Sequence, residues 1–395
     1  MNARTVPRLF FRVRLTALMS VWFAGGLFSQ RDSVSHWNFG GYVKNLQNWV
    51  FTDQRNSLFN GGFFHNRLTV KWLPDSNWTF DAEARNRLFY GEWVRFQPGW
   101  AETLDQDKGW VDLSFVPIHR PSLIGSVVAD RLWAQWQRGR WNVRLGRQRI
   151  NWAVALTWNP NDWFNAWNFL DFDYEERPGA DALRVQYRTG AFSSLDVAAS
   201  PARDKKQWIG AARFSGNLRQ YDWQAQAGVY RNRLAAGLGW AGNLGQAGFK
   251  GEVSVFHPLD RAEGTTSVSA AAGVDVTLGD SWYVNGGLLV NSRGSSGNID
   301  VFALNRSDLS PDNLMPGKVS FAAGGSHVFT PLFTTSLTAV YSPNGRLTIL
   351  IPTAAYSVAE NWDLDLTGQL FWLKSGQGAL KNALNWLFLR VRWSF

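Results

Sequence analysis

The chain has 395 residues, of which 45% are hydrophobic, 15% aromatic and only 18% charged, and its formal charge is +9. This charged fraction is below the roughly 25% of ordinary soluble domains, so the composition disfavours an ordinary soluble surface. Cysteine is absent, which excludes disulfides, thiolate catalysis and cysteine-based zinc sites. Basic residues are interleaved with acidic ones rather than clustered, and we therefore expect no nucleic-acid partner.

Residues 1–30 have the pattern of a cleaved signal peptide. Basic residues precede an apolar stretch from Leu15 to Phe28, and the small or polar Ser29 and Gln30 follow it. The stretch is shorter than the ~20 residues of a membrane-spanning helix, and no apolar run long enough for such a helix comes later. We expect cleavage near residue 30 and a mature domain at 31–395, with an uncleaved anchor as the alternative.

From Trp37 onward, apolar and polar residues alternate over about ten residues at a time, as in the strands of transmembrane barrels. In the segment 78–90, for example, most of the even positions are aromatic or aliphatic, among them Trp78, Phe80 and Leu88, whereas Arg85 and Arg87 lie on the odd side. The pattern predicts an all-β fold, a transmembrane antiparallel up-and-down β-barrel of about 18 strands, with sixteen or twenty as alternatives. We place the strands near 37–50, 62–73, 78–90, 130–138, 141–151, 181–189, 192–200, 207–216, 221–231, 234–243, 247–257, 266–278, 281–292, 318–329, 332–342, 346–358, 361–373 and 384–395.

The connections between these segments alternate in length. The long ones, near 91–129, 152–180 and 293–317, all belong to the class that would be external if both termini are periplasmic. Tryptophans next to the short turns are placed for an interfacial aromatic girdle, although a sugar-binding surface is the alternative. The girdle candidates are Trp72, Trp78, Trp136, Trp141, Trp282 and Trp362. A sugar-binding role is a stronger alternative for Trp158, Trp163 and Trp167, because these three lie in a loop.

The last segment alternates up to the terminal residue. Apolar and aromatic residues occupy one side of it, and Arg390 and Arg392 lie on the other side. The apolar side consists of Leu389, Val391, Trp393 and Phe395. This segment resembles the C-terminal strand of bacterial outer-membrane proteins. The resemblance implies recognition by the barrel-assembly machinery and a location among the lipids of the bacterial outer membrane.

Residues 147–187 form the most distinctive stretch. A strand end at Gly146-Arg147-Gln148 and a turn at Arg177-Pro178-Gly179 look like the corresponding parts of alginate-export-like and uncharacterised porin-like proteins. Strict alternation would point Arg147 and Arg149 into lipid, which is costly. We therefore expect a bulge near Gly146, or a strand that has already left the bilayer, that turns both arginines toward the following loop.

The loop 152–180 is expected to fold into the pore and constrict it. Its acidic residues would face basic residues of the barrel wall across a transverse field that sorts solutes by charge. The acidic set is Asp171, Asp173, Glu175 and Glu176. The basic pore-lining set is Arg85, Arg87, Arg144, Arg184, Arg188, Arg390 and Arg392. A solvated cap on the barrel mouth or a Ca²⁺ site are the alternative readings of the acidic residues.

These features favour a porin-like channel for diffusion of small hydrophilic solutes, with anionic or sugar-acid solutes attracted by the arginines. We expect no enzyme activity, cofactor or metal, because the five histidines lack triad-like or ligand-spaced neighbours. The alternative is a non-conducting barrel that serves as a platform in an envelope complex. A homotrimer is compatible with the sequence but is not indicated by it.

Overall fold

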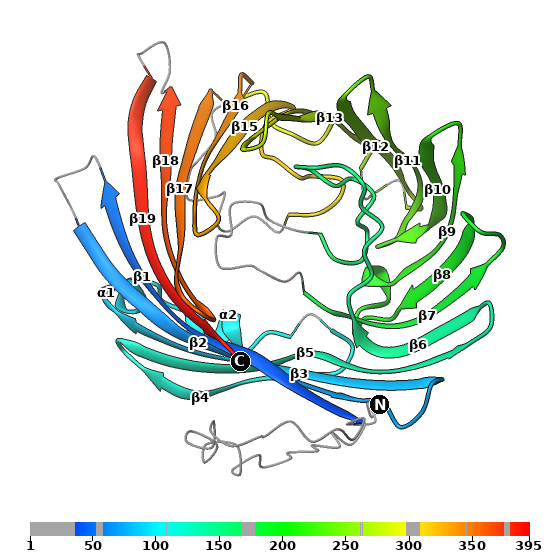
Figure 1. Cartoon of the computed structure of the whole chain (residues 1–395), viewed down its shortest axis with the longest axis horizontal. Coiled ribbons are helices and arrows are strands. Elements are labelled where there is room, and N and C mark those ends of the chain that lie inside the picture. Colours follow the sequence, from blue (N-terminus) through cyan, green and yellow to red (C-terminus); the bar gives the residue numbers. More distant parts are fainter. Residues whose placement is uncertain are drawn as a thin grey trace, which may run out of the picture. The chain divides into compact units, whose positions relative to one another are not determined.

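The computed structural model describes residues 36–52, 58–107, 109–166, 178–260, 262, 264–297, 309–344, 346–374 and 380–395. Within them, nineteen antiparallel strands form one sheet (Figure 1). The strands are β1 (Trp37–Thr52), β2 (Leu58–Trp72), β3 (Trp78–Gly91), β4 (Ser114–Arg120), β5 (Leu123–Arg138), β6 (Trp141–Gln148), β7 (Ala180–Arg188), β8 (Ser194–Ser200), β9 (Ile209–Leu218), β10 (Tyr221–Tyr230), β11 (Arg233–Leu244), β12 (Ala247–Pro258), β13 (Ser267–Leu278), β14 (Trp282–Asn291), β15 (Val319–Thr330), β16 (Phe333–Ser342), β17 (Leu347–Ala359), β18 (Trp362–Lys374) and β19 (Leu380–Ser394).

The sheet closes on itself because β1 pairs with both β2 and β19. The terminal residue completes this seam, since the backbone N–H and C=O of Phe395 both bond to Gly41, each at 3.0 Å. Strand β3 pairs directly with β5, so β4 lies outside the circuit and 19 − 1 = 18 strands form the barrel. A closed antiparallel barrel of eighteen strands is thus confirmed, and each predicted segment corresponds to one of its strands.

The long-loop region at 91–129 differs most from the prediction. It contains two short helices, α1 (Glu92–Arg95) and α2 (Trp100–Leu104), the extra strand β4, and the first half of β5. The strand predicted at 130–138 in fact begins at Leu123. No helix in the described ranges is long and apolar enough to cross a membrane.

Strand β4 fills a gap in the barrel wall. Strand β6 pairs with β5 only from Leu132 to Arg138, and β4 pairs with the remaining edge of β5. Arg147 lies in the notch between β4 and the end of β6. Its guanidinium binds Asp181 at 2.7 Å and Asp107 at 2.6 Å, and it also donates to the carbonyl of Val111 at 2.7 Å.

The expected bulge near Gly146 is wrong, because the ladders on both sides of it are continuous. A positive φ of 117° at Gly146 redirects the chain instead, and a Cβ there would come within 2.2 Å of the carbonyl oxygen of Leu132. Arg147 turns toward the loop 91–129 rather than toward 152–180. Arg149 is exposed.

The two faces of the wall follow the predicted alternation over most of the barrel. At the rim with the short turns, the outward tryptophans Trp72, Trp78, Trp141, Trp282 and Trp362 are between 36% and 51% exposed. The rings of Trp37 and Trp72 stack at 5.4 Å, and those of Trp72 and Phe80 at 5.0 Å. Such a continuous outward band is typical of an aromatic girdle at a membrane interface.

Candidate functional site: the barrel lumen

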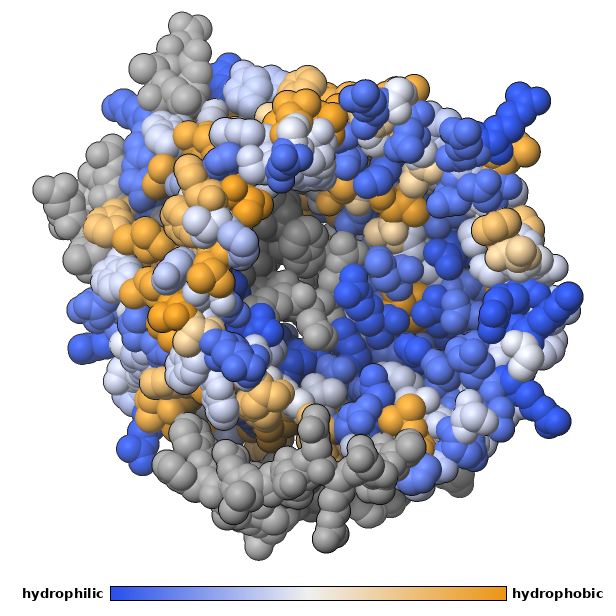
Figure 2. All heavy atoms as spheres, viewed as in Figure 1, coloured by the Kyte–Doolittle hydropathy of each residue, from blue (hydrophilic) through white to orange (hydrophobic). Residues whose placement is uncertain are grey.

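The inner wall of the barrel has a basic face and an apolar face. The basic face starts on β19 and continues over β1, β2 and β3 to β9. Figure 2 shows hydrophilic residues gathered on the inner side of β6–β9. On β19 and β1–β3 it carries Lys44, His65, Arg67, Arg85, Arg87, Arg390 and Arg392. Because these strands are neighbours, cationic side chains that are far apart in the sequence lie at similar heights in the lumen.

Two of these arginines share one carboxylate. Asp130, at a bulge of β5, accepts from Arg67 at 3.0 Å and from Arg85 at 2.9 Å. Arg390 is paired with Asp365 at 2.8 Å. The guanidinium of Arg87 lies over the ring of Phe89, 5.1 Å from its centroid. The basic face is therefore held in place by ion pairs and ring contacts.

A second group, which we call the arginine cluster, consists of Arg144, Arg184 and Arg213 on β6, β7 and β9. Asp196, which is fully buried, pairs with Arg184 at 2.5 Å and with Arg213 at 3.4 Å. Arg144 lies over the ring of Trp133 at 4.1 Å and donates to Gln135 at 2.9 Å. One carboxylate thus faces two guanidiniums, with a third in the neighbouring row, so the local charge is positive.

The loop after β6 lies against the inner wall at the arginine cluster. The indole N–H of Trp152 donates to Asp196 at 3.0 Å, and Arg213 lies over the same ring at 5.5 Å. Farther along, the indole N–H of Trp163 donates to Ser254 at 3.0 Å. Residues 152–166 therefore follow the inside of the barrel from β8 to β12, in agreement with the expected inward fold of this loop (Figure 1).

One carboxylate of the wall accepts several backbone hydrogen bonds from this loop. Glu252, on the inner side of β12, has no exposed surface and accepts the backbone N–H groups of Val154, Ala155 and Asn161, the last two at 2.7 and 2.8 Å. The side chain of Asn161 is fixed in turn, since its amide donates to the carbonyl of Leu238 at 2.9 Å. A single carboxylate thus holds both ends of an eight-residue turn, Val154–Asn161, against the wall.

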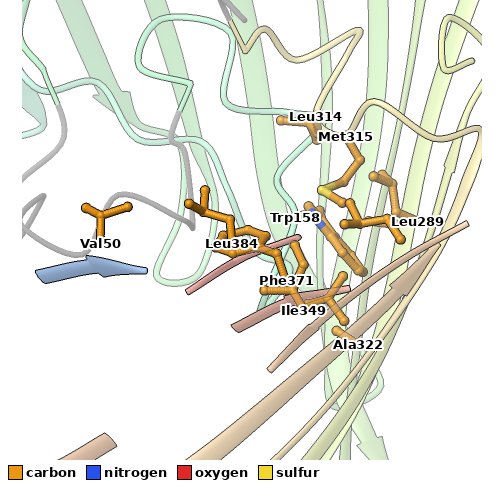
Figure 3. Close-up of a cluster of buried hydrophobic side chains, with 12 residues drawn as sticks. Val50, Trp158, Leu289, Leu314, Met315, Ala322, Ile349, Phe371 and Leu384 are labelled. Carbon is orange, nitrogen blue, oxygen red and sulfur yellow. The ribbon is translucent and has the colours of Figure 1, made fainter. Parts of the chain in front are cut away.

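The apolar face lies opposite the arginine cluster, on β13–β19 and the end of β1. Buried side chains from these strands pack with Trp158 of the inward loop and with Leu314 and Met315 of the connection between β14 and β15 (Figure 3). The wall residues of this cluster are Val50, Ala271, Leu289, Ala322, Val340, Leu347, Ile349, Phe371 and Leu384. Trp158 and Trp163 are 3% and 1% exposed, so neither contributes to a sugar-binding surface.

The second inward segment, 309–317, is fastened by Asp312. This carboxylate pairs with Arg233 of β11 and with Arg293, the latter at 2.6 Å, and it accepts from Ser310 at 2.7 Å. Burial alone would raise the pKa of Asp312, but the hydrogen bond from Ser310 and the charges of the two arginines outweigh it. The pKa of this carboxyl is consequently held below its usual range.

The predicted site residues fall into three groups. Arg85, Arg87, Arg144, Arg184, Arg390 and Arg392 lie on the inner wall. Arg188 is exposed at the short-turn rim, where it donates to the carbonyl of Gly139 at 3.4 Å, and is therefore not brought together with the others. Asp171, Asp173, Glu175 and Glu176 lie outside the described residues, as do Trp167 and residues 1–30.

Several lumen residues were not identified from the sequence. Lys44, Arg67 and Arg213 lie at inward positions of strands that alternate in sequence, so the alternation could have revealed them. Glu252 also has inward parity, but its partners are about a hundred residues away and no local pattern indicates them. Among the described residues, no group of three or more acidic or histidine side chains could hold a metal ion.

No protein-family model matches the sequence, and no curated protein matches it significantly. Solved structures do match over nearly the whole chain. OpdQ of Pseudomonas aeruginosa has a TM-score of 0.56 at 10% identity, covering 92% of this chain and 99% of that one. OpdL of the same organism has a TM-score of 0.57 at 10% identity, covering 91% and 98%.

The outer membrane protein opdK, also of Pseudomonas aeruginosa, has a TM-score of 0.55 at 8% identity, with 91% and 99% covered. At such low identity these similarities show the fold alone. The chain thus has the fold of a porin-like bacterial outer-membrane β-barrel, in which the short-turn rim is the periplasmic one.

Proposed function

We propose that this chain is a diffusion channel of the bacterial outer membrane for small hydrophilic solutes, and that it favours anionic solutes such as sugar acids. The observation that carries the proposal is the position of the arginine cluster. Arg184 and Arg213 flank the point where the inward loop meets the wall at Trp152. A solute that passes the point where the inward loop meets the wall therefore moves beside an excess of positive charge.

Positive charges outnumber negative ones in the arginine cluster. Arg144, Arg184 and Arg213 carry three positive charges, and Asp196 neutralises one of them. Low-dielectric walls focus the field of such a cluster into the lumen and raise the local concentration of anions. Because these arginines are held by ion pairs and rings, they offer several weak contacts rather than one deep site, which is what conduction requires.

The loop 152–180 is proposed to form the constriction. The packing of residues 152–166 against the wall supports this role, and the acidic residues at 171–176 would then supply the negative side of the transverse field. The likeness of residues 146–179 to alginate-export-like porins agrees with a sugar-acid solute. We also propose that residues 1–30 are removed as a signal peptide before the domain 31–395 assembles.

Liposome swelling tests the solute preference. Proteoliposomes are exposed to gluconate, to a neutral hexose and to glucosamine, which have similar size and opposite or no charge. We expect the fastest entry for gluconate and a several-fold loss of that preference in an Arg184→Gln/Arg213→Gln variant. Equal entry rates of the three solutes in the wild-type protein would overturn the proposed anion preference.

The matched control for this experiment is Arg203→Gln. Arg203 also pairs with an aspartate, Asp112, at 3.3 Å, but both side chains are more than half exposed outside the lumen. The control removes a positive charge without touching the arginine cluster. It should retain the wild-type preference for gluconate.

A further inference from the structure

Six neighbouring strands of the barrel carry a hydroxyl-bearing residue at the same level of the sheet. These residues are direct cross-strand partners, each paired with the next in the ladders from β13 to β18. We call this set the hydroxyl row: Thr277, Tyr283, Ser326, Ser336, Thr353 and Thr367. Because the Cβ atoms of directly opposed residues in antiparallel strands are about 5 Å apart, the row is a nearly continuous line of hydroxyl groups.

The hydroxyl row faces the lumen. Each of its residues is an even number of positions from a buried residue of the apolar face on the same strand, and such residues share one side of a strand. Ser336, for example, is four residues from Val340, and Thr353 is four residues from Ile349. Unlike the buried apolar residues, Ser326, Ser336 and Thr353 are only half-buried, so the row is open to the lumen.

The row lies opposite the arginine cluster. Strand β16, which carries Ser336, is 16 − 7 = 9 strands from β7, which carries Arg184, and this is half of the eighteen-strand circuit (Figure 1). Arg184 is four residues from Arg188 at the short-turn rim, and Ser336 is three residues from Phe333, where β16 begins. At a rise of ~3.3 Å per residue and a strand tilt of about 40°, both lie roughly 8–10 Å above that rim. A solute at this depth has guanidiniums on one side and hydroxyls on the other.

The chemistry of the row suits solutes that themselves carry hydroxyl groups. A serine or threonine hydroxyl has one donor and two acceptor positions and rotates to suit its partner. Thr367 donates to Thr353 at 3.2 Å, so neighbours in the row are within hydrogen-bonding reach of each other. Within the described part of the chain, the hydroxyls of Ser326 and Ser336 make no hydrogen bond and are available to a solute. An ether or alkyl group cannot donate to them, whereas a sugar hydroxyl both donates and accepts.

We propose that the hydroxyl row is the surface that selects polyhydroxylated acids over other anions of the same charge. This inference rests on the proposed conduction of anions, because the arginine cluster attracts the carboxylate while the row receives the hydroxyls. With strands ~4.8 Å apart, the row is roughly 24 Å long, so a moving solute exchanges one hydroxyl partner for the next. Repeated weak contacts of this kind raise the occupancy of the lumen without trapping the solute.

Relative permeabilities, obtained from reversal potentials in planar bilayers, test this selection. Gluconate is compared with methoxyethoxyethoxyacetate, which has the same charge and a similar size but ether oxygens in place of hydroxyls. We expect gluconate to be about five-fold more permeant in the wild type, because one net hydrogen bond changes a binding constant by about that factor. A Ser326→Ala/Ser336→Ala/Thr353→Val variant should pass both anions equally well. Equal permeability in the wild type, or an unchanged ratio in the folded row variant, would overturn the proposal.

The matched control is Thr335→Val/Thr348→Val. These two threonines alternate with inward residues on β16 and β17, so their side chains lie on the outer face of the same strands. The control removes hydroxyls from the same part of the wall without changing the row. It should keep the wild-type preference for gluconate, and a loss of the preference would count against the row.

A neutral pair of solutes separates this inference from the proposed anion preference and needs only the wild-type barrel. Swelling of proteoliposomes, corrected for protein-free liposomes, is measured with sorbitol and with tetraethylene glycol, which has a similar size but hydroxyls only at its two ends. We expect sorbitol to enter several-fold faster. Equal entry of the neutral pair beside a clear anion preference would overturn the hydroxyl row alone. Faster sorbitol entry without any anion preference would overturn the anion preference alone, and a folded barrel that passes no solute would overturn both.

Discussion

Replacing Glu252 with glutamine should release the inward loop while the barrel stays folded. The carboxylate accepts three backbone N–H groups, from Val154, Ala155 and Asn161. A glutamine keeps one acceptor oxygen, but its NH₂ group takes the place of the other oxygen and points N–H donors toward at least one of those backbone N–H groups. Because a hydrogen bond to a charged group contributes about 1.5–3 kcal/mol, we expect the docked loop to lose about 2–3 kcal/mol. This corresponds to an increase of about 30- to 150-fold in the undocked fraction.

Limited proteolysis measures this release. Chymotrypsin cleaves after aromatic residues, and Trp158 and Trp163 are almost fully buried when the loop is docked. If undocking limits cleavage, the rate at these two tryptophans, followed by fragment mass, should rise in proportion to the undocked fraction. The loosened loop should also increase the variance of single-channel currents.

The control variant is Asp275→Asn. Asp275 pairs with Lys250 of the same strand pair as Glu252, at 3.3 Å, and contacts no residue of the loop in the described structure. It removes the same charge from nearby without touching the turn. An unchanged cleavage rate at Trp158 and Trp163 in a folded Glu252→Gln barrel would show that Glu252 does not hold the loop, and so would an equal effect of both variants.

Three further expectations follow from single residues. Substituting Arg147 with methionine leaves Asp181 and Asp107 without their buried partner and should lower the free energy of unfolding by about 3–5 kcal/mol. The loss is measured on gels as a lower temperature at which the heat-modifiable folded band disappears. An unchanged temperature would contradict a role of Arg147 in sealing the wall. Because the pKa of Asp312 is lowered in the folded protein, its carboxylate contributes fully to stability above about pH 4, and this stabilisation is lost as the pH falls through the folded pKa. Acid should therefore expose the segment 309–317 to protease in the wild type. It should change nothing in an Asp312→Asn variant, in which the segment is already loosened. Deleting Phe395 removes the backbone pair with Gly41 and the aromatic terminus, and should reduce assembly in vivo, measured as folded barrel per cell; normal insertion would contradict an assembly signal.

The strand order could be read from the sequence because lipid and lumen impose opposite polarity on successive residues. All eighteen barrel strands were found in this way. The alternation failed where a strand is apolar on both faces or lies in a loop. In β17, Leu347, Ile349 and Ile351 face the inside as well, so the apolar face of the lumen has no period-two signature.

Strand β4 was missed for a related reason. Its seven residues include Pro117, which interrupts the pairing with β5 between Phe115 and Ile118. Arg147 was recognised as misplaced for a lipid-facing residue, but its partner Asp107 is forty residues away and belongs to a different loop. Such contacts are set by barrel closure and not by local sequence, and the same holds for Glu252 and its loop.

The arginine-lined lumen is proposed to conduct and to prefer anions. Reconstitution of the refolded protein in a planar bilayer, with a salt gradient across it, tests both properties together. We expect stepwise current increases and a reversal potential displaced toward that of the anion. A correctly folded barrel that remains silent, or one that prefers cations, would contradict the proposal, and silence would favour a structural platform in the envelope.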